Sequence, residues 1–362
     1  MANKIDEARK IINEVDAQMA ELFVKRMRAA EMVCAYKMEY GLPILDAARE
    51  EAVIRRNTAL IEDEVLKGYY MDYQRQVMAI SRAYQYRLQS GLKVAYSGVE
   101  GAFAHIAAGR IFPESERVSC GDFKAAYDAV VRGESDVAVL PIENSYAGEV
   151  GQTLDLIFSG GLFINGIYEL EIRQSLLGTP DARVEDIRRV VSHPQAISQC
   201  RDYIERRGLS AEEAENTALA ARAVAEAGDP TVGAIASAET AALYGLKVLE
   251  SPINTSGENT TRFAVLSKIK AASAPAASTV LMFTVKHEAG SLASAIAIIG
   301  RYGYNMTALR SRPMKKHSWQ YYFYVEIEGS TDDERGAAML RDLNTVCDRL
   351  KVAGTFIPHT EI

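Results

Sequence analysis

The sequence contains few cysteines and no pattern that would bind zinc or build a disulfide framework. Its four cysteines, Cys34, Cys120, Cys200 and Cys347, lie far apart, and no Cys-x-x-Cys pair occurs. Zinc sites and disulfide-rich scaffolds need closely spaced cysteines, so this distribution argues against both. It favours a reducing compartment, and we expect a cytoplasmic protein.

Long apolar runs and basic blocks are also missing. No apolar stretch approaches the roughly 18 residues that a membrane-spanning helix needs, and residues 1–7 lack the apolar segment of a secretory signal. The formal net charge is −7, which argues against nucleic acid as a partner. We therefore expect no membrane and no nucleic acid partner. An anionic small molecule would need a locally positive pocket.

Hydrophobic residues make up 48% and charged residues 25% of the 362 residues, the profile of a globular protein. The length allows two or three domains. Residue patterns divide the chain into an all-helical segment (1–90), an α/β segment (91–270), a linker of low complexity (271–278) and an α+β segment (279–362).

Apolar residues recur at three- and four-residue steps from residue 3 to residue 39, which predicts one long helix that Gly41 and Pro43 end. Further helices are predicted over residues 46–65, with Asp46 as N-cap, and over residues 69–88. Three such helices cannot enclose a hydrophobic core by themselves, so we expect a homodimer or a dimer of dimers.

Polar residues on these helices form a distinctive set. Arg26 and Lys37 lie three turns apart and share a face, whereas Arg9 lies about 25 Å from Arg26 along the helix axis. One small ligand could hardly touch both arginines within one chain, so any site that Arg9 serves is expected to be a partner's. The whole set comprises Arg9, Arg26, Lys37, Asp46, Arg49, Glu50, Ser81 and Gln85.

This set resembles the pattern of the all-helical chorismate mutases, in which the first arginine crosses from the partner subunit. The resemblance implies rearrangement of chorismate to prephenate, a pericyclic reaction that needs a held conformer and a stabilised ether oxygen. Lys37 and Gln85 would donate to that oxygen, and Glu50 would contact the ring hydroxyl. The other members would bind substrate. The alternative for any single residue is a solvated helix surface.

The α/β segment alternates short apolar strands, at residues 92–96, 137–140, 190–191 and 232–235, with helical runs. This order predicts two lobes with a cleft between them. No glycine-rich nucleotide motif occurs. Polar residues follow the strand ends, where such sheets bind ligands. They concentrate in Glu143-Asn144-Ser145, Ser192-His193-Pro194-Gln195-Ala196, Asn216-Thr217 and Thr260-Thr261-Arg262-Phe263.

Together these segments resemble prephenate dehydratase over residues 92–269, which implies conversion of prephenate to phenylpyruvate with loss of water and carbon dioxide. Aromatisation of the ring drives the reaction, so the barrier lies in expelling hydroxide, which needs a proton source. The resemblance assigns this role to Thr261. We expect its weakly acidic hydroxyl to act within a network that includes Glu143 or a water.

Prephenate carries two carboxylates, and only the ring carboxylate leaves. A bidentate arginine on the departing group would stabilise the ground state and slow its loss. We therefore expect Arg262 to hold the pyruvyl carboxylate. Asn144, Ser145 and Thr217 are further candidate contacts to the substrate.

Two histidines and one motif leave alternatives open. His193 could order its loop or contact substrate, and His105 is expected to pack or cap. The run Gly101-Ala102-Phe103-Ala104-His105 lacks two hydroxyls that the family's first motif usually carries. Either the affinity is weaker here or backbone amides bind the substrate.

The last segment shows the order strand, helix, two strands, helix, strand, with helices expected over residues 291–301 and 331–350. This is the ferredoxin-like pattern. With Gly290-Ser291-Leu292-Ala293, Asn305 and Ser311-Arg312-Pro313 it resembles an ACT domain, which implies phenylalanine as effector at Gly290, Leu292, Ala293, Asn305, Arg310, Ser311 and Arg312.

The combined resemblance points to a bifunctional enzyme with substrates chorismate and prephenate. Neither reaction needs redox chemistry or a Lewis acid, so no metal and no organic cofactor are expected. Two alternatives remain: a mutase whose middle domain only senses aromatic acids, and a two-lobed solute-binding protein. The intact Thr261-Arg262-Phe263 disfavours the first, and the absent signal segment disfavours the second.

The effector motif departs from its family at two positions, which yields a first prediction. Arg310 stands where the family has glutamate and Ala289 where proline is usual, and an arginine cannot pair with the ammonium of an amino acid. We expect weakened phenylalanine binding, unless residue 310 faces solvent and its charge is irrelevant. An equilibrium titration that shows tight phenylalanine binding would contradict this expectation.

Overall fold

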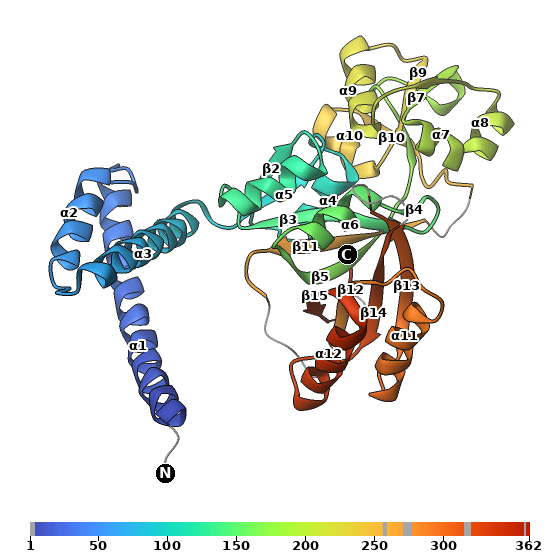
Figure 1. Cartoon of the computed structure of the whole chain (residues 1–362). Helices are drawn as coiled ribbons and strands as arrows, with labels where there is room; N and C mark the ends of the chain where they lie inside the picture. Colours follow the sequence, from blue (N-terminus) through green and yellow to red (C-terminus); the bar gives the residue numbers. More distant parts are fainter. Residues whose placement is uncertain (1–3, 256–258, 271–276, 315–319, 358–359) are drawn as a thin grey trace. The chain divides into compact units, whose positions relative to one another are not determined.

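The computed structural model describes residues 4–255, 259–270, 277–314, 320–357 and 360–362. Contacts divide the chain into two compact units, Met1–Leu92 and Lys93–Ile362 (Figure 1). Ser256, Gly257 and Glu258 of the loop before Thr260, and most of the predicted linker, lie outside the described residues. Within the described part of the chain, no helix is both long enough and apolar enough to cross a membrane.

The first unit consists of helices α1 (Lys4–Glu39), α2 (Ala47–Thr58) and α3 (Glu64–Ser90). Asp46 is the N-cap of α2, and its side chain accepts a hydrogen bond from the backbone N–H of Arg49, as the sequence predicted. The prediction that this helix continues to residue 65 is wrong. Asp63 accepts from the N–H groups of Val65 and Leu66 and so starts α3 instead, because a capping carboxylate satisfies the donors of a new helix.

Few side chains of α1 are buried within one chain. Only Ala30 and Cys34 are buried among its described residues, while large apolar residues such as Ile12, Val15 and Phe23 are exposed. A continuous row of exposed apolar residues on a helix of 36 residues leaves much of its surface without a packing partner.

The second unit begins with a mixed sheet whose strands run in the order β5-β11-β3-β1-β2. Strand β11 follows the second lobe in the sequence, and it pairs antiparallel with both β3 and β5. The elements of this first lobe are β1 (Lys93–Ser97), α4 (Phe103–Ile111), β2 (Glu116–Cys120), α5 (Phe123–Arg132), β3 (Val137–Asn144), β4 (Gly148–Glu149), α6 (Gly151–Ser159), β5 (Phe163–Glu171) and β11 (Thr260–Ser267).

A second sheet, ordered β10-β6-β9-β7-β8, forms the other lobe that the sequence predicted. The chain enters it after β5 and returns through β11, so the two lobes are joined by two crossings. Its elements are β6 (Ser175–Gly178), η1 (Val184–Asp186), β7 (Arg189–Ser192), α7 (Pro194–Gln199), α8 (Arg201–Arg207), β8 (Ser210–Glu213), α9 (Thr217–Ala227), β9 (Val232–Ala236), α10 (Ala238–Tyr244) and β10 (Lys247–Glu250).

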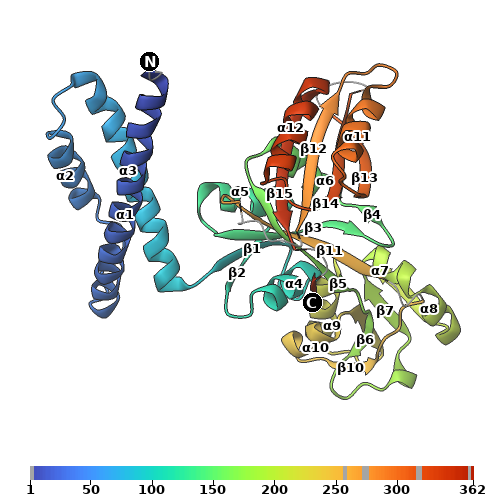
Figure 2. The same ribbon diagram turned by 90° about the horizontal axis from the view of Figure 1, so that it is seen from below.

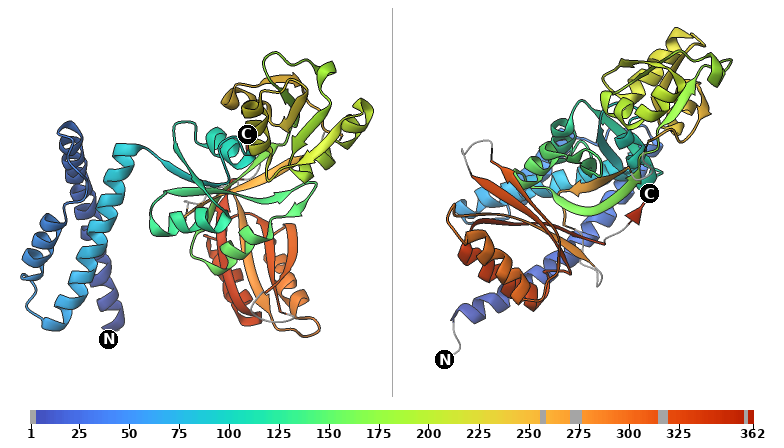
Figure 3. Two further views of the ribbon diagram at one scale, coloured as in Figure 1. Left: turned by 90° about the horizontal axis from the view of Figure 1, so that it is seen from above. Right: turned by 90° about the vertical axis from the view of Figure 1, so that its right-hand side faces the viewer.

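The C-terminal segment follows the predicted β-α-β-β-α-β order and places α11 and α12 together against one sheet (Figures 2 and 3). The helix predicted over residues 331–350 is too long. It ends at Val346, because residues from Cys347 onward pair with β12. The elements are β12 (Ser278–Val285), α11 (Ser291–Arg301), β13 (Met306–Pro313), β14 (Tyr321–Glu328), α12 (Glu334–Val346), β15 (Cys347–Phe356) and β16 (Thr360–Glu361).

This segment shares a hydrophobic core with the first lobe. Strand β15 pairs with β5 where Gly354 meets Ile164, so the two sheets are continuous. The rings of Phe158 and Tyr322 stack with centroids 4.4 Å apart, and both belong to one buried cluster. Burial of this area from water stabilises the contact between the segment and the lobe.

The junction at Gly354 provides a prediction for stability. A Cβ added to Gly354 would lie 2.0 Å from the carbonyl oxygen of Ile164, so Gly354→Ala should lower the free energy of unfolding by about 1–3 kcal/mol, measured in urea. Gly300→Ala is the matched control, because a Cβ there meets nothing within 4 Å and alanine favours a helix. Equal stability of the two variants would contradict the close approach.

Candidate active sites

The first unit contains a pocket of about 380 Å³ between its three helices. Helix α1 supplies Arg26 and Lys37, α2 begins at its N-cap Asp46, and α3 carries Ser81 and Gln85. Seven of the eight residues singled out in the sequence therefore line one cavity; they are Arg26, Lys37, Asp46, Arg49, Glu50, Ser81 and Gln85.

Several polar atoms in this pocket have unused hydrogen-bonding capacity. Arg26 donates from Nη2 to the sulfur of Met78 at 3.2 Å, and its buried Nη1 has no hydrogen-bond partner among the described residues. Lys37 donates from Nζ to the carbonyl oxygen of Ile44 at 2.5 Å, and Gln85 donates to Ser81. A buried cationic group with spare donors is suited to a carboxylate ligand.

Arg9 does not join this pocket. Its side chain is 68% exposed and lies 3.7 Å from the carboxylate of Asp6 on the same helix. The predicted separation from Arg26 along α1 therefore holds within one chain.

Arg82 is a pocket residue that sequence reasoning missed. It forms an ion pair with Glu50, and both side chains line the cavity. The residue directly follows Ser81, but spacing along one helix does not reveal an ion pair with another helix. The pair orients the carboxylate of Glu50 within the pocket.

The second unit contains a cleft of about 390 Å³ lined from both lobes. Four of the residues predicted to bind substrate or act in catalysis line it, namely Asn144, His193, Thr217 and Thr261. Ala102 and Ala104, where the two hydroxyls are absent, also line it. The wall also contains four residues that no sequence motif indicated, namely Glu149, Gln174, Gln199 and Glu215.

The hydroxyl of Thr261 has a defined hydrogen-bond polarity. Asn144 accepts through Oδ1 from the backbone N–H groups of Tyr146 and Ala147, at 3.0 and 2.8 Å. Its amide nitrogen therefore faces Thr261 and donates to Oγ1 at 2.9 Å. Because Thr261 accepts from Asn144, its own proton is left to be donated elsewhere. Glu143, proposed as a partner from sequence, does not fill this role.

The residues that line the cleft include no lysine or arginine, and two of them, Glu149 and Glu215, are acidic, so an anion there depends on backbone groups. Helices α4 and α9 both begin at its wall, where Ala102 to Ala104 and Glu215 to Thr217 lie. The N-cap Ala102 offers no side-chain bond, so the first N–H groups of α4 are not capped by it. Free N–H groups and the helix dipole together favour an anion.

Three predicted substrate residues lie outside the cleft lining: Glu143, Ser145 and Arg262. Side chains alternate along a strand, so Thr261 and Phe263 face the cleft while Arg262 faces the opposite side. Glu143 is its cross-strand neighbour and shares that side. Ser145 accepts a hydrogen bond through Oγ from the backbone N–H of Thr260.

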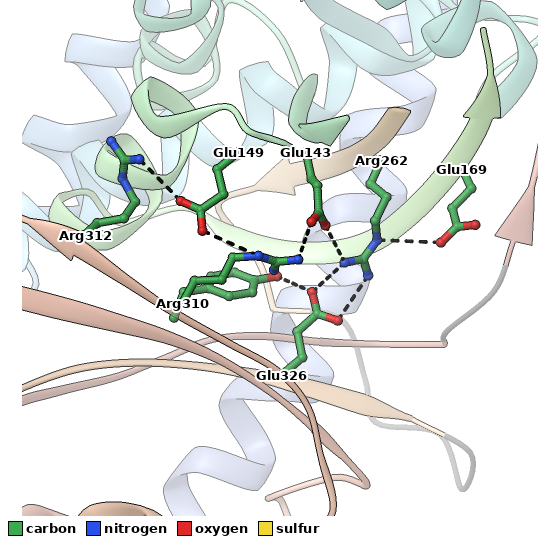
Figure 4. Close-up of polar contacts among 8 residues, drawn as sticks. Glu143, Glu149, Glu169, Arg262, Arg310, Arg312 and Glu326 are labelled. Carbon is green, nitrogen blue, oxygen red and sulfur yellow. Dashed lines mark hydrogen bonds and ion pairs between the residues drawn. The ribbon is translucent and has the colours of Figure 1, made fainter. Parts of the chain in front are cut away.

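Arg262 instead reaches the C-terminal segment (Figure 4). Its guanidinium donates to both carboxylate oxygens of Glu326, at 2.9 and 3.1 Å, and to Glu143 at 3.3 Å. Burial by itself would lower the pKa of Arg262, but its anionic partners, with Glu326 first and Glu143 after it, together raise the pKa above its ordinary value. The arginine is therefore fixed as a cation in an ion network.

The two histidines near the cleft have identifiable local roles. His193 is the N-cap of α7 and accepts through Nδ1 from the N–H of Gln195 at 3.2 Å, yet it also lines the cleft. His105 is buried and accepts from the N–H of Gly101 at 3.1 Å, which confirms the expectation that it packs or caps. Burial lowers the pKa of His105.

The residues predicted for the effector differ in their burial and in their contacts. Leu292 lines a cavity of about 470 Å³ in the C-terminal segment, whereas Gly290, Ala293, Asn305 and Ser311 are exposed. Gly290 begins α11 with a φ of +86°, a conformation that favours glycine. Arg310 and Arg312 form ion pairs with the first lobe. The alternative that Arg310 faces solvent is wrong, because its side chain is 20% exposed and paired.

Among the described residues, no group of three or more histidine, cysteine or acidic side chains is arranged to hold a metal ion.

Comparison with known proteins matches both units. A family model of chorismate mutase type II matches residues 8–86, and one of prephenate dehydratase matches residues 94–271. A bifunctional chorismate mutase/prephenate dehydratase of Aquifex aeolicus (strain VF5) is 31% identical over 361 residues, covering 98% of this chain and 98% of that protein.

Two solved structures resemble the second unit. The structure of GqqA, described as a novel type of quorum quenching acylase, has a TM-score of 0.69 and 31% identity, covering 74% of this chain and 98% of that one. A prephenate dehydratase from Arthrobacter aurescens in complex with L-Phe has a TM-score of 0.67 and 27% identity, covering 73% of this chain and 89% of that one.

The ion pair of Arg262 yields a prediction about folding. Glu326→Gln removes the main partner of a mostly buried guanidinium, so the second unit should lose about 3 kcal/mol in urea unfolding. Glu328→Gln on the same strand is the control, because residue 328 is exposed. If the two variants unfold at the same urea concentration, the pair does not stabilise the unit.

Proposed function

The chain belongs to the family of bifunctional chorismate mutase/prephenate dehydratases, and on that premise we propose how its residues divide the chemistry. It rearranges chorismate to prephenate and then converts prephenate to phenylpyruvate. The full-length match to a bifunctional relative favours two activities over a mutase with a sensing middle domain. The catalytic segments are assigned to residues 1–90 and 91–270.

In the mutase pocket, the enzyme selects a folded conformer of the dianion and stabilises charge on the breaking ether bond. Arg26 and Arg49 bind the carboxylates, and Lys37 and Gln85 donate to the ether oxygen. Glu50 holds the ring hydroxyl, with its carboxylate oriented by Arg82. No side chain transfers a proton, so the rate depends on the conformation in which the pocket holds the substrate.

The mutase is proposed to be completed by a second copy of the chain, in a homodimer or a dimer of dimers. Arg9 is exposed and outside the pocket of its own chain, and α1 carries a row of exposed apolar side chains. Pairing of two such helices would bury those residues and bring the partner's arginine to the open side of the pocket.

The dehydratase assignment rests on one observation, the donor polarity of Thr261. Asn144 occupies its acceptor position, so the threonine proton is directed to the leaving hydroxyl of prephenate. Free N–H groups at the helix starts bind the carboxylates. The lining residues include no guanidinium that would clamp the ring carboxylate, so its loss as carbon dioxide is not opposed. Arg262 acts in the ion network and not on the substrate.

Regulation by phenylalanine is proposed for the C-terminal segment, residues 279–362, as an ACT domain. The element order supports this assignment, as does the resemblance to a dehydratase whose structure is described in complex with L-Phe. The cavity beside Leu292 is the candidate effector position. The protein is proposed to act in the cytoplasm.

The decisive measurement follows chorismate, prephenate and phenylpyruvate separately after chorismate is added. The wild type should form phenylpyruvate. Thr261→Ala should stop at prephenate, with dehydratase turnover reduced about 10²- to 10⁴-fold, because the proton donor is lost. Thr261→Ser keeps the hydroxyl and should retain most of the activity.

Lys37→Ala is the complementary variant. It should lose the first step yet still convert added prephenate, because Lys37 belongs to the other unit. A wild type that stops at prephenate would contradict the dehydratase assignment, and a fully active Thr261→Ala would contradict the role of the threonine.

A further inference from the structure

One wall of the dehydratase cleft is a short hairpin made by the end of β3 and by β4. In this hairpin Asn144 pairs with Gly148, and Glu143 pairs directly with Glu149. Asn144, Ala147, Gly148 and Glu149 all line the cleft. The hairpin also carries the amide that fixes the hydroxyl of Thr261. Its position therefore determines the shape of the site.

The hairpin contains an unfavourable pair of charges. Like charges directly opposite each other on antiparallel strands destabilise the pairing. The side chains of Glu143 and Glu149 are only 24% and 26% exposed, so water screens their repulsion weakly. A hairpin with this sequence needs a cation between its strands to close.

That cation comes from the C-terminal sheet (Figure 4). Arg310 on β13 forms an ion pair with Glu143, and its Nε lies 3.5 Å from the carboxylate of Glu149. One guanidinium therefore bridges both glutamates. The group also lies 5.4 Å from the centre of the Tyr324 ring, which limits where it can move.

The remaining charged neighbours do not replace this bridge. Arg262 contacts Glu143 at 3.3 Å but is mainly engaged by Glu326, and it also lies 3.6 Å from Glu169. Arg312 contacts Glu149 at 3.4 Å and is shared with Asp155, which also accepts from the hydroxyl of Tyr322. The hydroxyl of Tyr324 donates to Glu326. Arg310 alone among these groups touches both hairpin glutamates.

We propose that Arg310 is a positioning residue of the dehydratase, which holds the hairpin of Glu143 and Glu149 closed so that the C-terminal sheet completes one wall of the cleft. The inference rests on the dehydratase assignment above. It gives the C-terminal sheet a role in the reaction even when no effector is bound. Arg310 does not touch substrate, since the cleft lining includes Glu149 but not the arginine.

The test is Arg310→Gln in the full chain, assayed with prephenate from pH 5.5 to pH 8. We expect kcat/KM at pH 8 to fall by about 10- to 100-fold, since a small displacement of a site wall costs this much. The loss should shrink toward pH 5.5. Acid lowers the negative charge that two facing carboxylates carry, and their mutual repulsion falls with it.

A second substitution separates electrostatic positioning from general damage. Glu143→Gln added to Arg310→Gln removes the repulsion and should restore at least several-fold of the lost kcat/KM at pH 8. Glu143 does not line the cleft, so it is suited to this purpose. Arg301→Gln is the matched control, because Arg301 is an exposed arginine at the end of α11. It should leave the pH profile unchanged.

The outcomes are distinct. Arg310→Gln activity within twofold of wild type across the pH range would overturn the proposal, and so would a loss that is independent of pH and not rescued by Glu143→Gln. Should Arg310→Gln fail to fold, Arg310→Lys keeps a cation beside the two glutamates and should retain most of kcat/KM, so a folded Arg310→Lys with a loss as large as that expected for Arg310→Gln would overturn the proposal. Mutase activity should persist in every variant. Inactivity of both wild type and Arg301→Gln toward prephenate would instead refute the dehydratase assignment.

Discussion

The two-residue period of strand β11 is the constraint on which the second unit depends. Because neighbouring side chains leave a strand on opposite faces, Thr261 enters the cleft and Arg262 enters the ion network with Glu326. Strand β3 shows the same alternation, because Asn144 lines the cleft while Glu143 lies on the side of Arg262. The cleft residues and the contacts to the C-terminal sheet therefore lie on opposite faces of the same two strands.

In the proposed mechanism, the two sites bind dianions by different physical means. Arg26, Lys37 and Arg49 line the mutase pocket, whereas the dehydratase cleft has helix starts and no lysine or arginine among its lining residues. A rearrangement that keeps both carboxylates gains from strong ion pairs. A reaction that expels one carboxylate gains from diffuse partial charges, which hold the anion without opposing its departure.

Much of the fold and many of the candidate site residues could be predicted from the sequence. Helical spacing placed Arg26 and Lys37 on one face, and the family resemblance added Glu50 and Gln85 to the same pocket and Thr261 to the cleft. What failed depended on contacts between distant elements. The pairing of residues 347–356 with β12 shortened a predicted helix, and the buried carboxylate of Glu326 binds Arg262 on the side of β11 opposite the cleft. Local patterns carry no information about such partners.

The stacked rings of Phe158 and Tyr322 show that the C-terminal segment and the first lobe share one core. The domains of a multidomain enzyme are often treated as independent units that can be exchanged between proteins. Here, replacing the C-terminal segment with a foreign one would expose apolar surface on the first lobe and leave the glutamates of its hairpin without Arg310. A viable chimera must carry the matching lobe residues along with the new segment, so packing forces the two parts to be exchanged together.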